Sequence, residues 1–247
     1  TTTDTTTTTE PTSTTEPLLY NCIPFKYNPM SLSDIKYVGS EELNDIDTGG
    51  IKLSGLDSKI NITQYFHYGQ VDVILKTSKG MNVISSFYIE SKNKNQVLFN
   101  MNSTTIETNF SYKGKIRNRM AEYYSPNRIL SETYNKYSLL WLPEYYEWRF
   151  NNILLRRLYK NETNSYPDSP SIINFSIKES MDSCESLKIN SIQLRCPNFF
   201  IINDSIIYVK KNENHDDIDV KINNGNKSNL SILIFLVSLF ASALFFF

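Results

Sequence analysis

Glycine, histidine and cysteine are scarce in this chain of 247 residues, and their scarcity excludes several kinds of site. The 8 glycines form no GxGxxG or GxxxxGK pattern, so the sequence has no loop of the kind that cradles nucleotide phosphates. Two histidines, His67 and His215, and 3 cysteines are too few for a His-rich metal site and argue against a Cys/His zinc module. We therefore predict no metal, no cofactor and no nucleotide partner.

An excess of charge of one sign is also absent. Lys and Arg number 25 against 26 Asp and Glu, a net charge of −1. Nucleic-acid binding requires clustered basic charge, so we predict no nucleic-acid partner. Hydrophobic residues make up 40% and aromatic residues 13%, which is enough to build a core. The length favours one domain with tails.

The first tail is rich in threonine. Residues 1–17 read TTTDTTTTTEPTSTTEP, in which eleven residues are Thr. Such a run has no apolar face to bury, so backbone entropy favours disorder. The composition is typical of an O-glycosylated stalk, and an unmodified solvated tail has the same composition.

The other end is apolar. Residues 230–247, LSILIFLVSLFASALFFF, contain no charged residue, and the polar linker of residues 211–229 precedes them. An apolar tail behind small polar residues is typical of a signal for a glycosylphosphatidylinositol anchor. A C-terminal membrane span is the alternative, since 18 residues are near the lower limit for crossing a bilayer. Both interpretations place the domain, predicted over residues 18–210, at the outer face of a membrane or in a cell wall.

Sequons and cysteines fit a secreted glycoprotein. Cys184 and Cys196 enclose a short loop and are the pair expected to form a disulfide, with Cys22 left over, although three cysteines allow other pairings. The N-x-[S/T] sequons begin at Asn61, Asn102, Asn109, Asn161, Asn174, Asn203, Asn226 and Asn229.

Short apolar-alternating runs separated by polar breaks fill the middle of the chain and predict strands. Runs near 71–76 and 83–88 are apolar on both parities, as in strands that are buried on both faces. No helix of convincing length is predicted between the tails. The fold class is therefore an all-β sandwich. The predicted strands are 51–53, 69–77, 82–90, 96–101, 104–112, 136–142, 145–150, 153–158 and 171–177.

Residues 68–96, YGQVDVILKTSKGMNVISSFYIESKNKNQ, resemble the core of family 16 glycoside hydrolases. The subgroup that they resemble most is the fungal Crh-type cell-wall transglycosylases. Those proteins have a strand of the form G-K-V-E-V-x-L-K followed by G-x-V-S-S-F-Y-L-x-S. The matching positions here are Gly69, Val71, Val73, Leu75, Lys76, Val83, Ser85, Ser86, Phe87, Tyr88 and Ser91.

Later segments continue the resemblance in the same order. Residues 108–114 resemble the family's Q-S-N-F…K-G strand, residues 137–148 its paired Trp-bearing strands, and residues 166–170 its Y-P-x-S-P turn. The matches cover about residues 50–178. The resemblance implies a concanavalin-like β-jelly-roll sandwich of two antiparallel sheets. It also implies a glycan cleft on the concave face and a chitin- or β-glucan-containing wall as the setting.

The strand that should carry the catalytic acids differs from the family pattern D-E-I-D-I-E. The resemblance places Gln96 at the nucleophile, Leu98 at the bridging Asp and Asn100 at the acid/base. An amide is a poor nucleophile and cannot cycle a proton near neutral pH. An alignment slip restores no acid, because residues 92–106 contain neither Asp nor Glu.

Other cleft positions also depart from the family. The family's aromatic sugar platform falls near Lys178, its D-G turn is Asn151-Asn152, and its His before the first Trp strand is Asn135.

Four residues remain as candidates for the cleft: Glu107, Asn109, Trp141 and Trp148. Glu107 is expected to share a face with Asn109, where a lone acid binds a sugar hydroxyl or, in the bolder interpretation, activates water. A solvated or hydrogen-bonding Glu is the plainer interpretation, as is core or cleft-wall packing for the two tryptophans. The basic run KGKIRNR, residues 113–119, is either a solvated loop or a contact for anionic glycan or lipid headgroups.

The sequence thus predicts a surface-anchored coat or glycan-binding protein of cell-wall chitin or β-glucan, with the fold of a glycosidase and without its catalytic centre. The alternative is an active glycosidase or transglycosylase that remodels cell-wall β-glycans. A third hypothesis is a protein-binding module that uses the sandwich as a scaffold.

Overall fold

Two compact units make up the chain. A computed structural model describes residues 22–27, 35–38, 46–47, 50–55, 57–80, 83–117, 120–162, 166–178, 186–196, 199–202, 205–211 and 218–223. One unit is Tyr20–Pro197, and the other combines Thr1–Leu19 with Asn198–Phe247. The predicted stalk of residues 1–17 and anchor of residues 230–247 lie outside the described residues.

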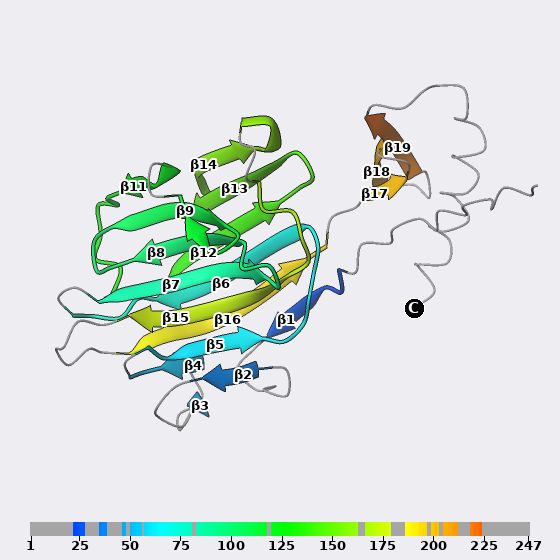
Figure 1. Ribbon diagram of the computed structural model, residues 1–247. Coiled ribbons are helices and arrows are strands. Elements are labelled where there is room, and N and C mark those ends of the chain that lie inside the picture. Colours follow the sequence, from blue (N-terminus) through cyan, green and yellow to red (C-terminus); the bar gives the residue numbers. More distant parts are fainter. Residues whose placement is uncertain are drawn as a thin grey trace, which may run out of the picture. The chain divides into compact units, whose positions relative to one another are not determined.

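Two antiparallel eight-stranded sheets form the first unit (Figure 1). Sheet A has the order β14-β13-β12-β6-β16-β4-β3, with β1 paired to β16. Its strands are β1 (Phe25–Tyr27), β3 (Ile46–Asp47), β4 (Gly50–Leu53), β6 (Gly69–Lys76), β12 (Asn135–Trp141), β13 (Tyr145–Phe150), β14 (Ile153–Tyr159) and β16 (Leu187–Arg195).

Sheet B has the order β10-β9-β8-β7-β15-β5-β2, with β11 paired to β9. A 3₁₀ turn, η2 (Lys160–Glu162), follows β14 of sheet A. The strands of sheet B are β2 (Ile35–Val38), β5 (Lys59–Ile62), β7 (Ile84–Ser91), β8 (Gln96–Met101), β9 (Ile106–Tyr112), β10 (Lys115–Ile116), β11 (Glu122–Tyr124) and β15 (Ser171–Lys178).

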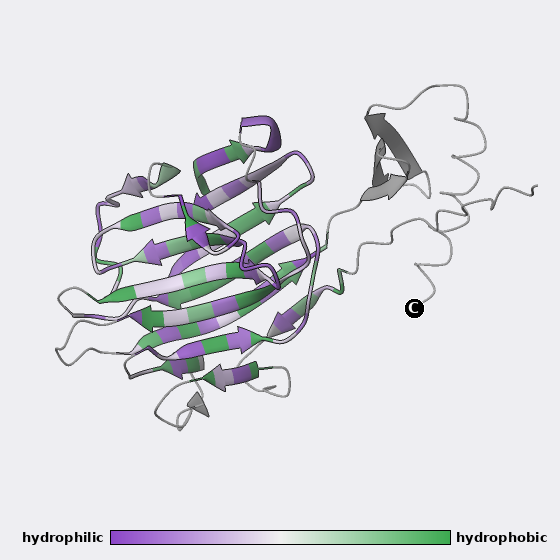
Figure 2. Ribbon diagram, viewed as in Figure 1, coloured by the Kyte–Doolittle hydropathy of each residue, from purple (hydrophilic) through white to green (hydrophobic). Residues whose placement is uncertain are grey.

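All nine predicted strands are present within a few residues of their expected bounds, and the predicted sandwich of two antiparallel sheets is confirmed. In β6, Val71, Val73 and Leu75 are at most 1% exposed and face the core, whereas Ile74 and Lys76 of the other parity are partly exposed. Figure 2 shows the same alternation of apolar and polar residues along the central strands.

A row of phenylalanines joins the central strands of sheet B inside the sandwich. Phe87 lies directly opposite Phe99 of β8 and Phe175 of β15, with ring centroids 5.9 and 5.4 Å apart. Tyr137 of sheet A meets Phe99 edge-on at 5.5 Å and so ties the sheets together. These residues are fully buried, and aromatic pairs of this kind stabilise a core beyond the area that they bury.

Strand β16 was not predicted, although it lies at the centre of sheet A. It pairs with β6 along nearly its whole length and with β4 and β1 on its other edge. A register shift between Ile189 and Ser191 interrupts its alternation, so the sequence pattern is weaker than in its neighbours. Long-range pairing, which a local pattern does not reveal, places this strand.

Three further strands form a separate antiparallel sheet in the second unit. They are β17 (Phe199–Ile202), β18 (Ser205–Lys211) and β19 (Ile218–Asn223), in that order. The domain predicted over residues 18–210 would include part of this sheet, whereas the two compact units divide between residues 197 and 198.

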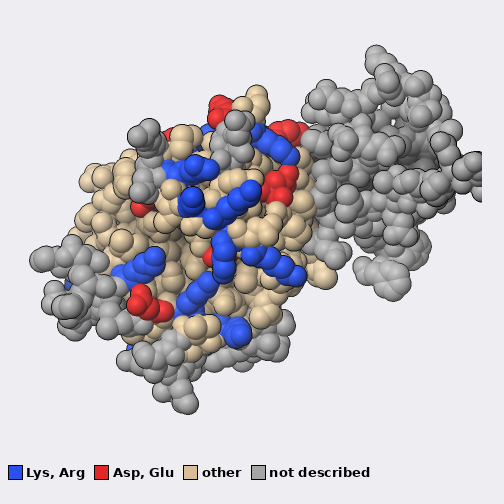
Figure 3. Space-filling model, in the orientation of Figure 1, with Lys and Arg blue, Asp and Glu red and all other residues tan. Residues whose placement is uncertain are grey.

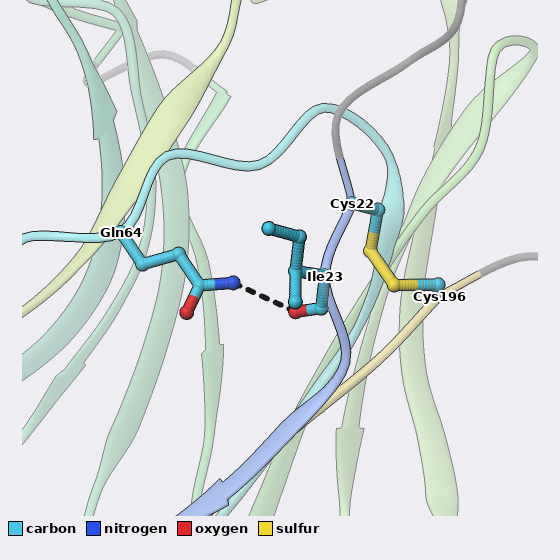
Figure 4. The surroundings of a disulfide bond; sticks show 4 residues. All are labelled: Cys22, Ile23, Gln64 and Cys196. Carbon is cyan, nitrogen blue, oxygen red and sulfur yellow. Dashed lines mark hydrogen bonds between the residues drawn. A yellow bond between two sulfur atoms is a disulfide. The ribbon is translucent and has the colours of Figure 1, made fainter. Parts of the chain in front are cut away.

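The predicted disulfide between Cys184 and Cys196 is wrong, because Cys196 has a different partner. Cys196 is bonded to Cys22, which lies 174 residues earlier, and Cys184 lies outside the described residues (Figure 4). The pairing of β1 with the end of β16 brings the two cysteines together, and Gln64 Nε2 donates to the Ile23 carbonyl at 2.7 Å beside them. The spacing of the cysteines in the sequence could not indicate the Cys22–Cys196 bond, because that bond depends on the pairing of β1 with β16. A disulfide is typical of an oxidising compartment.

Among the described residues, no helix is long and apolar enough to cross a membrane. The predicted C-terminal anchor is not among those residues.

Removing the disulfide should destabilise the fold. Because the bond closes a loop of 174 residues, we expect Cys22→Ser or Cys196→Ser to lower the free energy of unfolding by about 2–5 kcal/mol. Thermal unfolding with and without reductant would measure it, with Cys184→Ser as the matched control. If Cys184→Ser instead lost as much stability as the other two variants, the observed pairing would be refuted.

Candidate functional site

Strand β8 presents the three residues that the family resemblance assigns to the catalytic positions. Val97, Phe99 and Met101 are at most 1% exposed and face the core. Gln96, Leu98 and Asn100 therefore lie on the outer face of sheet B, with β7 and β9 on either side. That these positions correspond to the family's acids stays a prediction.

Glu107 lies beside Asn100 at one end of this face. The two residues are directly opposite in the β8–β9 register, and Asn100 Nδ2 donates to Glu107 Oε2 at 3.1 Å. Asn109 Nδ2 donates to Glu107 Oε1 at 3.0 Å, and Ser86 Oγ donates to Asn100 Oδ1 at 2.8 Å. The structure thus brings Glu107 and Asn109 together, and amide donors occupy both carboxylate oxygens.

A second carboxylate, Glu90 of β7, was not recognised from the sequence. Its Oε2 accepts from Gln96 Nε2 at 2.5 Å, and its Oε1 lies 3.2 Å from Lys94 Nζ and 3.7 Å from Lys59 Nζ. Burial by itself raises the pKa of Glu90, but the Gln96 hydrogen bond and the two lysines outweigh it and hold the pKa below its ordinary value. Because Phe87 faces the core, the alternation of side chains along β7 could have placed Glu90 on the outer face.

The two carboxylates lie at opposite ends of the outer face. Glu90 is opposite Gln96, and Glu107 is opposite Asn100. Those two β8 positions are separated by about 13 Å along the strand, at about 3.3 Å per residue. Glycosidases place their paired carboxyl groups about 5–5.5 Å apart for retention and about 6.5–9.5 Å apart for inversion. Glu90 and Glu107 also lie on either side of β8, about 9.6 Å apart across the sheet. Each carboxylate is bonded to a β8 amide, so the two do not form a catalytic pair in this geometry.

Trp141 and Trp148, cleft candidates for which packing is the plainer interpretation, lie in the core. Both are at most 1% exposed. Trp148 Nε1 donates to the Leu98 carbonyl across the sandwich at 3.0 Å, and the Trp141 ring packs against Tyr146 with centroids 5.4 Å apart. Each tryptophan has the inward parity of its strand, so neither offers a surface on which a sugar stacks.

The other residues that depart from the family pattern are not on the outer face of β8. Asn151 and Asn152 form the β13–β14 turn with φ values of 47° and 68°, a conformation that Asn tolerates in tight hairpins. Asn135 is buried and accepts from Arg128 Nη1 at 3.1 Å. Lys178 ends β15 and is exposed.

A cluster around Asp168 lies in the Y-P-D-S-P turn. Asp168 Oδ1 accepts from Tyr68 Oη at 2.9 Å and lies 3.0 Å from His67 Nε2, and Oδ2 accepts from Lys160 Nζ at 2.6 Å. Burial by itself raises the pKa of Asp168, but the bonds from His67, Lys160 and Tyr68 outweigh it and hold the pKa well below its ordinary value.

A pocket of about 560 Å³ opens beside this cluster. The volume is within the range of small-molecule sites. The turn before β8, the end of β9 and the Asp168 turn form its walls, so it adjoins the end of the outer face at which Gln96 lies. The lining residues are Asn93, Asn95, Tyr112, Lys113, Tyr166, Asp168 and Ser169. Among the described residues, no group of three His, Cys, Asp or Glu is placed to hold a metal ion.

A family model described as glycosyl hydrolases family 16 matches residues 39–190. Crh-like protein CRH12 of Candida albicans is 31% identical over 122 residues, which cover 46% of this chain and 23% of that protein. Probable glycosidase CRR1 of Eremothecium gossypii is 26% identical over 130 residues, which cover 49% of this chain and 29% of that protein. The similarity thus extends over less than a third of the length of either relative.

Solved structures share the fold. A Crh5 transglycosylase in complex with NAG superposes with a TM-score of 0.63 at 16% identity, covering 74% of this chain and 92% of that one. A Bacillus licheniformis β-glucanase gives a TM-score of 0.60 at 12% identity, covering 71% of this chain and 99% of that one.

The Asp168 cluster should make stability depend on pH. A lowered folded-state pKa contributes stability above the unfolded pKa of about 3.9, and that stability is lost as the pH falls through the folded pKa. We expect Asp168→Asn to cost about 1–3 kcal/mol at pH 7, and the difference from the unmodified protein to shrink below about pH 4. Urea unfolding across pH would measure it.

The exposed Asp57 provides the control for that experiment. Asp57→Asn should change the free energy of unfolding by less than about 0.5 kcal/mol. A deficit in Asp168→Asn that stayed constant down to pH 2 would contradict the assigned charge network.

Burial should decide which sequons carry glycans in protein secreted from a eukaryotic host. Asn102 and Asn161 are exposed, whereas Asn109 and Asn174 are 0% exposed. A glycan on a fully buried amide prevents packing, so we expect occupancy at the first two sites and none at the last two. Mass spectrometry after enzymatic deglycosylation would measure this, and a glycan at Asn109 in folded protein would contradict it.

Proposed function

This chain belongs to glycosyl hydrolase family 16, and from this premise we propose that it binds a cell-wall β-glycan, chitin or β-1,3-glucan, without cleaving it. One observation carries the proposal: the outer face of β8 presents an amide, an aliphatic side chain and a second amide, Gln96, Leu98 and Asn100. A retaining mechanism requires a nucleophile and a proton donor on one face, and these side chains supply neither.

The two carboxylates near β8 support the same proposal. A general acid needs a raised pKa near neutral pH, whereas the pKa of Glu90 is lowered by Gln96, Lys59 and Lys94. Glu107 accepts hydrogen bonds from the amides of Asn100 and Asn109 and so acts as a hydrogen-bond acceptor. Both acids therefore hold neighbouring side chains in place and remain able to orient sugar hydroxyls.

Relatives support the choice of glycan. The Crh5 structure contains NAG, N-acetylglucosamine, which is the unit of chitin. The Cys22–Cys196 disulfide fits secretion, and the stalk and anchor predicted from the sequence fit attachment to a membrane or wall surface.

The alternative function is enzymatic, and the comparisons favour it. The named relatives include a probable glycosidase and a transglycosylase, so an active enzyme that remodels cell-wall β-glycans is the function expected from kinship alone. In this chain such an enzyme would need Glu107 or Glu90 to act as its acid.

A turnover assay separates the two functions. The full chain, secreted from a eukaryotic host, would be incubated with fluorescent chitin and β-1,3-glucan oligosaccharides, and both hydrolysis and transfer products would be measured. We expect no product from the native protein, and product from the variant Gln96→Glu/Leu98→Asp/Asn100→Glu, because that variant restores the alternating acids.

Binding is measured on the same samples. The oligosaccharides should raise the melting temperature of the native protein, since a ligand at one hundred times its Kd stabilises by about 2.7 kcal/mol. No shift with any of them would instead favour the protein-binding module. Turnover by the native protein that disappears in Glu107→Gln or Glu90→Gln would establish the enzymatic alternative and identify its acid.

A further inference from the structure

Lysines from two turns gather beside the pocket next to β8. Lys92 and Lys94 lie in the turn between β7 and β8, and Lys113 and Lys115 lie at the β9–β10 turn, and all four are exposed. Figure 3 shows Lys and Arg side chains in a band across this side of the sandwich, with fewer Asp and Glu side chains among them.

Hydrogen bonds hold the two turns together. Gly114 N donates to the Lys94 carbonyl at 3.0 Å, Ser111 Oγ donates to the same carbonyl at 3.1 Å, and Lys113 N donates to Asn95 Oδ1 at 2.7 Å. The backbones of the two turns are therefore held side by side, and the four exposed lysines project from neighbouring positions of the fold.

The nearby carboxylates already have cationic partners. Glu90 is bonded to Lys94 and lies near Lys59, and Asp168 is bonded to Lys160. Lys92 and Lys113 lie over the rings of Tyr65 and Tyr112, at 5.3 and 5.4 Å, which leaves their charge uncompensated by an acid in those contacts. Lys113 lines the pocket, and the two turns that contribute to its walls carry four lysines and no acid, so these turns form a lysine rim.

Lining side chains of the pocket suit a sugar. Asn93 and Asn95 carry amides that match hydroxyl groups, and the half-exposed ring of Tyr112 provides an apolar surface beside Lys113. A neutral sugar would use the amides and the ring, but it would leave the lysines without a role.

We propose that this pocket and its lysine rim bind an anionic unit of the glycan, a sugar that carries a carboxylate, phosphate or sulfate group. The inference rests on the proposed glycan binding and specifies its chemistry. Lys92, Lys113 and Lys115 attract the anionic group, and Asn93, Asn95 and Tyr112 contact the sugar. The same charges disfavour a cationic chain such as deacetylated chitin.

Matched oligosaccharides test this inference on the full-length protein. Laminarihexaose, its derivative with the primary alcohols oxidised to carboxylates, and fully deacetylated chitin hexamer would be titrated by calorimetry at 50 mM salt. We expect the carboxylated chain to bind about five- to tenfold more tightly than the neutral one, and the cationic chain to bind most weakly. The preference should fall at 500 mM salt, because salt screens exposed charges.

Two triple variants carry the same change of charge. Lys92→Gln/Lys113→Gln/Lys115→Gln should lose the preference for the carboxylated chain while still binding the neutral one. Lys52→Gln/Lys76→Gln/Lys188→Gln removes three lysines that lie opposite one another on sheet A, and it should keep the preference. A control variant that lost the preference equally would overturn the proposed site.

The remaining outcomes separate this inference from the proposed function. If the neutral and carboxylated chains bind equally, the anionic specificity is overturned and glycan binding stands. If neither these chains nor the acetylated chitin hexamer binds, glycan binding itself fails and the inference falls with it. Phosphatidylserine vesicles that bind through the same lysines, without any preference among oligosaccharides, would assign the cluster to lipid headgroups and overturn the inference. Inorganic phosphate should compete with the carboxylated chain.

Discussion

The phenylalanine row within sheet B fixes the strand register on which everything else depends. Phe99 of β8 lies between Phe87 of β7 and Tyr137 of sheet A, and a slip of one residue would move it to the outer face. That slip would expose a large apolar ring and bury side-chain amides that would lack hydrogen-bond partners. The packing of Phe99 therefore determines that Gln96, Leu98 and Asn100 face outward, and the core dictates the chemistry of the site.

Two partly buried carboxylates serve as hydrogen-bond acceptors in the fold. Glu90 and Asp168 each accept bonds from several donors, and each has a pKa held below its ordinary value despite burial. Donors that stabilise the charged form make an acid a good structural acceptor and a poor proton donor. The lowered pKa of Glu90 and the geometry of β8 thus both support binding without cleavage at the outer face of sheet B, although the kinship with glycosidases favours an enzyme.

Local patterns in the sequence were sufficient for most of the sandwich, because alternation and turn residues specify strands such as β6 and β13 directly. They were insufficient where a contact joins distant segments. Strand β16 carries a shifted register and is recognisable only beside β6, and Cys22 meets Cys196 only because β1 pairs with β16. The burial of Trp141 and Trp148 follows from parity, which was available from the sequence, and packing was the plainer interpretation of both residues.

The proposed absence of catalytic acids from β8 and the lysines of the adjacent turns have one electrostatic consequence. A strand that alternates Asp and Glu places several negative charges on the outer face, and these offset basic residues nearby and repel anionic sugars. In the proposed assignment, Gln96, Leu98 and Asn100 occupy these positions and carry no charge, so β8 contributes no acid that offsets the lysines of the adjacent turns. In the proposed assignment, the residues that leave the face without a nucleophile also leave it without charges that repel an anionic glycan, and we expect the two properties to occur together.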